Sequence, residues 1–196
     1  MTTTPEELWK DARRGDQSAW QQLYGLFGGS VYQFFLRNTR NVETAADKTQ
    51  EVFLRIFKSR EAFSGGSLKS WIFRIARNLL IDEWRKAGHR EVLSENLPEV
   101  ADQSTQVEEE VINAIEHAQM KMLIDECLDQ LDEDSRMTIC LVYLAGLSIP
   151  ELAGVMEMPL GTAKTRVRQA RLKLDAMLCE KMQIKGLDKA YELQRT

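Results

Sequence analysis

The sequence is poor in the residues on which enzymes and metalloproteins usually depend. It has two histidines, His89 and His117, and three widely spaced cysteines, Cys127, Cys140 and Cys179. No cysteine has a histidine near it in the sequence, and no glycine-rich phosphate loop is present. We therefore expect no enzyme activity, no small-molecule substrate, no metal and no cofactor. An odd number of distant cysteines also suits a reducing compartment, so we expect the protein in the cytoplasm.

Long apolar runs are missing as well. No run approaches the roughly 20 residues that cross a bilayer. The N-terminal sequence MTTTPEELWKDARRGD lacks the cationic start and the apolar segment of a signal peptide. Hairpin signals and internal repeats are also absent. The apolar fraction of 43% is nevertheless ordinary for a globular protein. Apolar residues recur at helical spacing, so the sequence predicts an all-α fold.

Charge is distributed unevenly along the chain. The net charge of −4 argues by itself against a nucleic-acid-binding protein. However, seven acidic residues and no Lys or Arg lie between Glu95 and Glu116, and removing seven negative charges from −4 leaves +3 for the rest. Fields act within about 10 Å at moderate salt, so the local balance decides binding. We interpret Glu95 to about Glu110 as a solvated acidic linker.

This linker divides the chain into two small helical domains. We expect a first domain at residues 1–93, a flexible linker at 94–115 and a second domain at 116–196. Thr4 begins a capping box, and Asp16 caps a second helix that ends near residue 40. A third helix is expected from about residue 43 to residue 60, and Ser67 caps a fourth. The first domain should therefore be a helical bundle.

A helix-turn-helix pattern organises the second domain. Asp132 should cap a helix from Glu133 to Ala145 that Gly146 ends. Ser148 and Glu151 then form a capping box for a short helix, and a second helix begins between residues 159 and 162. This second helix carries apolar residues on one face, namely Ala163, Val167, Ala170 and Leu174. Its opposite face is basic and polar, with Lys164, Thr165, Arg166, Arg168, Gln169, Arg171 and Lys173.

The basic face is typical of a helix that reads DNA. An α-helix fits the major groove, where Arg, Lys, Gln and Thr side chains contact base edges. A solvated basic face on a core helix is the alternative. The capped short helix and the turn that precede the basic helix favour DNA recognition instead.

Both domains resemble bacterial sigma factors of the extracytoplasmic-function group. In the second domain the matching residues are Gly-Leu-Ser at 146–148, Glu-Leu-Ala at 151–153, Pro-Leu-Gly-Thr at 159–162, Lys-Thr-Arg at 164–166 and Ala-Arg at 170–171. In the first domain they are Asp47, Gln50, Glu51, Phe53, Trp71, Ile75, Ala76, Asn78, Asp82 and Arg85. Because both sets occur in order around an acidic linker, the resemblance covers most of the chain.

Three positions depart from the family pattern. Glu157 stands in the turn where the family often has Gly, so a left-handed backbone there would cost about 1 kcal/mol. Gln169 stands where many members carry Arg, which leaves the DNA sequence that is read open. Lys48 replaces an apolar residue next to Asp47.

The resemblance implies an alternative sigma factor. Such a protein binds RNA polymerase core through the β′ clamp and the β flap, recognises the −35 and −10 promoter elements, melts DNA and directs transcription initiation. An anti-sigma factor is a further expected partner, and through it alone a membrane. The implied −35 contacts are Thr162, Lys164, Thr165, Arg166, Arg168, Gln169 and Arg171. The implied core-binding residues are Asp47, Gln50, Glu51, Phe53 and Arg55.

The implied −10 contacts lie in the loop before the fourth helix and on that helix. They are Phe63, Ser64, Gly65, Gly66, Phe73, Arg74, Arg77, Asn78 and Arg85. Melted DNA needs stacking surfaces and a basic groove for its unpaired bases, and a glycine-bearing loop beside aromatic residues can form a pocket for one base. We expect Trp71 in the bundle core, and Phe63 and Phe73 as the better candidates for DNA contact.

Two other classes of protein compete with a sigma factor. A helix-turn-helix regulator that binds DNA without replacing the sigma subunit would explain the second domain but not the first. A pure interaction module, such as an anti-sigma adaptor, would leave the basic helix unexplained. Two interpretations of the linker are open. It is either a segment that occupies the RNA path of polymerase or a solubilising spacer.

Overall fold

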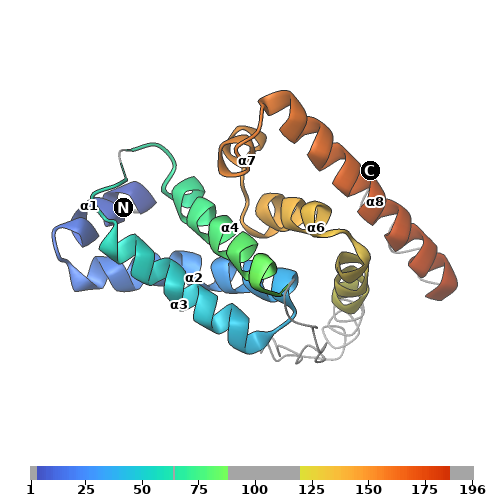
Figure 1. The fold of residues 1–196 in the computed structure, drawn as a ribbon, viewed down its shortest axis with the longest axis horizontal. Coiled ribbons are helices and arrows are strands. Elements are labelled where there is room, and N and C mark those ends of the chain that lie inside the picture. The colour runs from blue at the N-terminus through green and yellow to red at the C-terminus, as the bar shows by residue number, and fades with distance from the viewer. Residues whose placement is uncertain (1–3, 64, 88–119, 186–196) are drawn as a thin grey trace, which may run out of the picture.

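The computed structural model describes residues 4–63, 65–87 and 120–185, and these residues form helices and short connections without a strand (Figure 1). The first half contains α1 (Pro5–Arg13), α2 (Gln17–Thr39), α3 (Val42–Lys58) and α4 (Leu68–Ala87). The second half contains a helix at 120–130, α6 (Glu133–Ile139), the π-helix η1 (Cys140–Leu144), α7 (Ile149–Val155) and α8 (Leu160–Lys185). The all-α prediction is confirmed. The acidic linker and the expected domain boundaries lie outside the described residues.

Side-chain caps begin the helices of the first half where the sequence predicts them. The Thr4 N–H donates to Glu7 Oε2 at 2.8 Å, and the Glu7 N–H donates back to Thr4 Oγ1 at 3.2 Å. Asp16 Oδ1 accepts from the N–H groups of the first turn of α2. Ser67 Oγ accepts from the Ser70 N–H at 3.2 Å. These bonds satisfy donors that a helix leaves unpaired at its start.

Helix α2 is the centre of the first half, with α1, α3 and α4 packed against it. Its Phe34 and Phe35 are fully buried. Phe73 of α4 is also 0% exposed and meets Phe34 edge-to-face, with 5.9 Å between ring centroids. The prediction that Phe73 contacts DNA is therefore wrong. Phe73, Ala76 and Leu80 form an i, i+3, i+7 stripe that the apolar periodicity already contained.

Two large aromatic residues of α2 and α3 lie at the surface. Tyr24 is 51% exposed and Phe57 is 48% exposed. Each ring rests against another aromatic ring, Tyr24 on Phe53 and Phe57 on Trp20. Helices α2 and α3 present these residues at the edge of their contact, so one side of each ring is covered and the other faces solvent.

The second half follows the predicted caps but contains an unpredicted π-helix. Asp132 Oδ1 accepts from the Ser135 N–H at 2.8 Å and starts α6. The helix then widens at Cys140, and the Ala145 N–H donates to the Cys140 carbonyl five residues back. Gly146 has φ +63° and ends the segment as predicted. The π-helix packs against α2, so its wider turn is part of the contact between the two halves.

The helix-turn-helix has the expected turn with a strained residue in it. The Ser148–Glu151 capping box is present, and α7 ends at the turn formed by residues 156–159. Glu157 has φ +54°, so it adopts the left-handed backbone that glycine would adopt here without strain. The Met158 N–H donates to the Ala153 carbonyl at 3.0 Å, a bond that closes the helix end in this conformation.

The two halves pack against each other in the structure. Helix α2 meets α6 and η1, and α4 meets α7. A single cluster of buried side chains runs through both halves and contains Phe35 and Leu80 as well as Cys140 and Leu141. Figure 1 shows α7 beside α4, with α8 leading away from that contact. None of the helices in the described ranges combines the length and apolar character needed to cross a bilayer.

The strained turn yields a stability prediction. Glu157→Gly should raise the free energy of unfolding by about 1 kcal/mol, because glycine adopts a positive φ without a Cβ clash. Glu157→Gln keeps the Cβ but removes the charge, so it isolates the backbone effect. Urea unfolding followed by circular dichroism measures both variants. Equal stability of the Gly and Gln variants would show that the turn is not strained.

Candidate nucleic-acid interface

Helix α8 presents a continuous polar face to solvent. Its Ala163 and Ala170 are buried against the second half, as predicted. The exposed residues of its first turns are Thr162, Lys164, Thr165, Arg168, Gln169 and Arg171. Among them, Arg171 pairs with Asp175 one turn further along, with 3.5 Å between Nε and Oδ2. This face has the size and chemistry of a helix that enters the major groove.

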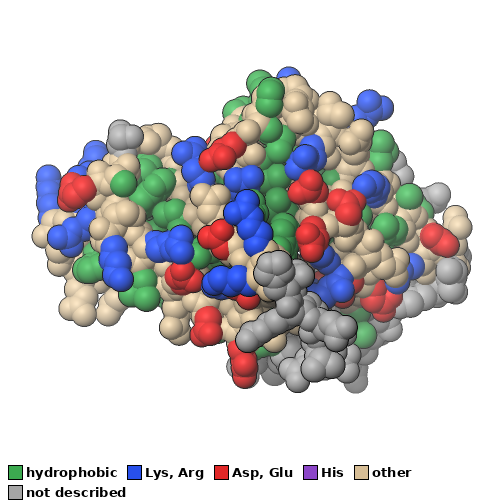
Figure 2. All heavy atoms as spheres, in the orientation of Figure 1, with side chains coloured by type: hydrophobic (Ala, Val, Ile, Leu, Met, Phe, Trp, Pro, Cys, Tyr) green, Lys and Arg blue, Asp and Glu red, His purple; other side chains and the backbone are tan. Residues whose placement is uncertain are grey.

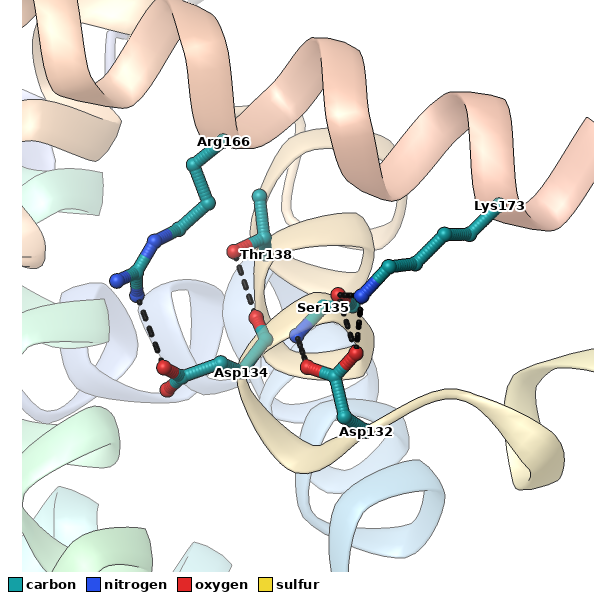
Figure 3. Close-up of polar contacts among 6 residues, drawn as sticks. All are labelled: Asp132, Asp134, Ser135, Thr138, Arg166 and Lys173. Carbon is teal, nitrogen blue, oxygen red and sulfur yellow. Dashed lines mark hydrogen bonds and ion pairs between the residues drawn. The ribbon is translucent and has the colours of Figure 1, made fainter.

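Two cations of α8 point toward α6 instead of away from the protein (Figure 3). Arg166 Nη1 lies 3.4 Å from Asp134 Oδ2, and Lys173 Nζ lies 2.6 Å from Asp132 Oδ2. Both cations stand three residues after a buried alanine, which places them beside the buried stripe. The sequence did not reveal these partners, because the acids lie far upstream. Arg166 stays a predicted DNA contact, but it must leave Asp134 to make that contact.

Asp132 has two roles at the start of α6. It accepts from the Ser135 N–H and, through Oδ2, from the Ser135 hydroxyl at 2.8 Å. The hydrogen bond from Lys173 is the main cause that lowers the pKa of Asp132 to about 2; burial opposes this effect, and the hydrogen bonds from Ser135 add to the lowering. The carboxylate therefore caps α6 and anchors α8 at the same point.

The predicted −10 residues gather at the loop before α4 and along that helix. Gly65 and Gly66 have φ values of +114° and +89°, a conformation that side chains disfavour. Phe63 is half-buried and packs against Trp9 and Trp71. Arg74, Asn78 and Arg85 are exposed, whereas Arg77 is largely covered. Ser64 lies outside the described residues.

Helix α1 holds both ends of this loop, which the sequence did not suggest. Arg13 forms an ion pair with Glu61 just before the loop. Glu6 Oε1 accepts from the Leu68 N–H at 3.3 Å just after it. Between these points Trp9 supports Phe63 edge-to-face, with 5.8 Å between ring centroids. Contacts between residues so distant in sequence leave no local pattern.

The predicted core-binding residues lie on α3 outside its buried stripe. Asp47, Gln50 and Arg55 are exposed, and Phe53 is half-buried. Leu54, one turn after Gln50, is 57% exposed and belongs to the same face. Leu54 was not predicted as part of this face, although an apolar residue outside the buried stripe was a usable signal.

Lys48 is explained by its partners. Its Nζ lies 3.0 Å from Glu51 on α3 and 3.2 Å from Glu83 on α4. Burial alone would lower the pKa of this amine, but the hydrogen bonds to Glu51 and Glu83 outweigh burial and raise the pKa. Lys48 thus ties α3 to α4 by charge where an apolar residue would tie them by packing.

A helix-turn-helix with a basic outer helix, joined to a second helical bundle, defines a two-part DNA-binding transcription protein. The family model "Sigma-70 region 2" matches residues 23–90, and "Sigma-70, region 4" matches residues 121–174. The chain therefore belongs to the sigma-70 family, in its extracytoplasmic-function (ECF) group.

Individual relatives agree with this assignment. The chain is 29% identical over 163 residues to ECF RNA polymerase sigma factor SigE of Mycolicibacterium smegmatis, covering 82% of this chain and 63% of SigE. It is 28% identical over 175 residues to SigW of Bacillus subtilis, covering 86% and 94%. Among solved structures, CnrH in complex with the cytosolic domain of CnrY matches with a TM-score of 0.63 and 25% identity, covering 88% of this chain and 96% of CnrH.

The roles of Asp132 predict a pH-dependent stability. Asp132→Ala should lower the free energy of unfolding by about 1 kcal/mol at pH 7 through the lost cap. Asp132→Asn keeps an acceptor for the cap but loses the charge. The pKa of this group is lowered on folding from 3.8 to about 2, so its contribution is present above the unfolded pKa and is lost as the pH falls through the folded pKa.

The difference in the free energy of unfolding between wild type and Asp132→Asn should therefore disappear between about pH 4 and pH 2. In this range Asp132 of the wild type becomes protonated in the unfolded and then in the folded state. Urea unfolding at a series of pH values measures this gap. A gap that stays constant across this range would contradict the ion pair with Lys173.

Proposed function

We propose that this alternative sigma factor divides its work between two surfaces, one on each half. The single observation that carries the proposal is the solvent-exposed polar face of α8 in a capped helix-turn-helix. Sigma factors direct RNA polymerase core to promoters, and polymerase performs the catalysis, so we assign the chain no reaction of its own. The domains are proposed at 1–93 and 116–196, with the acidic linker at 94–115.

The second half would read the −35 element through α8. Residues near the start of a recognition helix meet base edges, and later residues meet phosphates. Lys164, Thr165 and Arg168 are exposed in the first turns and are the proposed base readers, together with Thr162 and Gln169. Arg166 would join them once it leaves Asp134, and Arg171 would contact phosphate. The same half would also meet the β flap, as the family relationship implies.

The first half would open and hold the −10 element. The two glycines with positive φ shape a loop that the aromatic residues Trp9, Phe63 and Trp71 support from below. This aromatic cluster, together with exposed Arg74 and Asn78 on α4, suits the binding of an unstacked base and its phosphate. Arg77 and Arg85 would extend the phosphate contacts along α4, and Ser64 belongs to the same proposed loop.

The α3 face would bind the β′ clamp of RNA polymerase core. Asp47, Gln50 and Arg55 supply polar contacts, with Glu51 and Phe53 at the border of the face. Exposed Leu54 adds the apolar anchor that stable interfaces place among polar residues.

Two further points follow from the family relationship. An anti-sigma factor is the proposed regulatory partner, since CnrH was solved with the cytosolic domain of CnrY. Such a partner would also supply any link to a membrane, and the protein itself would act in the cytoplasm with polymerase. A regulator that binds DNA without joining polymerase is disfavoured, because "Sigma-70 region 2" covers residues 23–90 of the first half.

The decisive test is run-off transcription with core RNA polymerase in the presence and absence of the protein. Transcripts from its promoters should depend on the added chain. Gln50→Ala together with Glu51→Ala should reduce co-purification with core, because Gln50 supplies a polar contact of the proposed clamp face and Glu51 lies at its border. Circular dichroism confirms that the double variant is folded. No transcript with added protein, or full core binding by the folded double variant, would count against the respective assignment.

A second test separates base readers from phosphate contacts. Arg168→Ala should relax the preference at one or two −35 positions, since a bidentate Arg–guanine contact is worth about 1–3 kcal/mol of discrimination. Arg171→Ala should weaken all promoters alike and lower the salt slope by about 0.9. Transcription from a −35 library by each variant holoenzyme measures both effects. A solvated basic face would instead leave the sequence preference of every variant unchanged.

A further inference from the structure

Helix α1 turns one face toward the loop at residues 62–67, here called the −10 loop. Glu6, Trp9 and Arg13 stand at i, i+3 and i+7, so their side chains leave α1 on the same side. Trp9 is only 2% exposed and meets the rings of Phe63 and Trp71 edge-to-face. In Figure 1, α1 lies beside the connection between α3 and α4. This helix also precedes the segment that the region 2 family model matches.

Two polar contacts from this face hold the two ends of the −10 loop. Arg13, at the end of α1, forms an ion pair with Glu61 where the loop begins. Glu6, in the first turn of α1, accepts from the Leu68 N–H at 3.3 Å where the loop ends. That N–H is one of the donors that α4 leaves unpaired at its start, so Glu6 completes the cap that Ser67 begins. A carboxylate also suits the positive end of the helix dipole.

Between its two ends the loop has little support of its own. Gly65 and Gly66 have φ values of +114° and +89°, and no described atom beyond their chain neighbours lies within 4 Å of the place where a Cβ would stand. Glycine also has a wider choice of backbone conformations than other residues. The placement of the two glycines therefore depends on the fixed ends of the loop and on the aromatic contacts of Phe63.

Helix α1 is fixed to α2 by contacts that do not involve this face. Leu8 and Ala12 are buried, and α1 packs on α2. The Trp20 indole N–H donates to the Ala12 carbonyl at 2.9 Å. The Arg13 and Glu61 side chains are 35% and 75% exposed, and an ion pair so close to water contributes little to the free energy of unfolding. Breaking this pair should therefore leave the fold intact.

We propose that α1 fixes the geometry of the −10 loop, so that Glu6 and Arg13 are positioning residues for promoter opening. The inference rests on the proposed function, since it takes this loop as the site that receives an unstacked base. A site that is ordered before binding loses less conformational entropy when its ligand enters. Neither residue has to contact DNA for this effect. Their loss should slow opening of the −10 element and leave the α8 and α3 surfaces unchanged.

Reversing the ion pair separates positioning from a general effect of charge. Arg13→Glu and Glu61→Arg each place two like charges where the loop begins. The double variant restores an ion pair with its signs exchanged and keeps the net charge of the wild type. Arg14→Glu is the matched control, because it makes the same charge change one residue away, where the side chain is 80% exposed.

The experiment uses holoenzyme formed from core RNA polymerase and each variant, on a promoter that the wild-type holoenzyme transcribes. Permanganate reactivity of thymines in the −10 element measures the rate of opening, and anisotropy at low temperature measures binding of the closed duplex. Arg13→Glu and Glu61→Arg should each slow opening about three- to fivefold, the size expected for an exposed ion pair. The double variant should recover to within about twofold of wild type. Arg14→Glu should match wild type, and binding of the closed duplex should not change.

Glu6 is tested with the same assay. Glu6→Ala removes the acceptor of the Leu68 N–H and should slow opening, whereas Glu6→Gln should open at nearly the wild-type rate, because its amide oxygen still accepts. Circular dichroism and co-purification with core accompany each variant. A role limited to stability of the fold would change these two measurements together with opening, and an exchange of charges would not restore them.

Three results would overturn the inference: normal opening by both single variants of the ion pair, no recovery in the double variant, or an equal loss in the Arg14→Glu control. The same assay separates this inference from the proposed function. Wild-type holoenzyme that opens the promoter no faster than the single variants refutes the positioning role and leaves the sigma function standing. Wild-type protein that supports neither opening nor transcription refutes the function itself.

Discussion

The burial of α2 on several sides is the constraint on which the rest of the structure depends. Phe34, Phe35 and Leu36 are consecutive and all buried, so they point in different directions around the helix axis. A helix that is apolar around its circumference needs neighbours around its circumference. Helices α1, α3 and α4 supply them from the first half, and α6 and η1 supply them from the second. The need to cover α2 therefore explains why the two halves meet.

Because the two halves are in contact, the two proposed DNA surfaces differ in their exposure to solvent. The α8 face is open to solvent, whereas part of the α4 face lies under α7. Glu151 is central to this difference, because it accepts from Ser148 of its own helix and from Ser67 of α4. The residue that starts the helix-turn-helix thus also joins it to the other half.

Local sequence signals were sufficient for the elements but not for the contacts between them. The caps at Asp16, Asp132 and Ser148 and the buried stripe of α8 depend on neighbouring residues, and all were predicted. Phe73 was misplaced because aromatic residues serve equally in a core and on a base-stacking surface. The contact of Arg166 with Asp134 and the contacts of α1 with the −10 loop could not be predicted, because they join distant segments.

Acidic residues that pair with basic ones also limit the electrostatic attraction between this protein and DNA. Asp134 and Asp132 hold Arg166 and Lys173, Asp175 holds Arg171, and Glu157 faces Arg77. A cation that is already paired gains less free energy from a DNA phosphate, because its own partner must first be displaced. Lys164 and Arg168 are exposed, and the structure shows no such partner for them among the described residues, so they are the proposed source of unspecific attraction on α8. In a chain of net charge −4, most of these Lys and Arg side chains would therefore contact DNA only at a promoter that is positioned to displace their acidic partners.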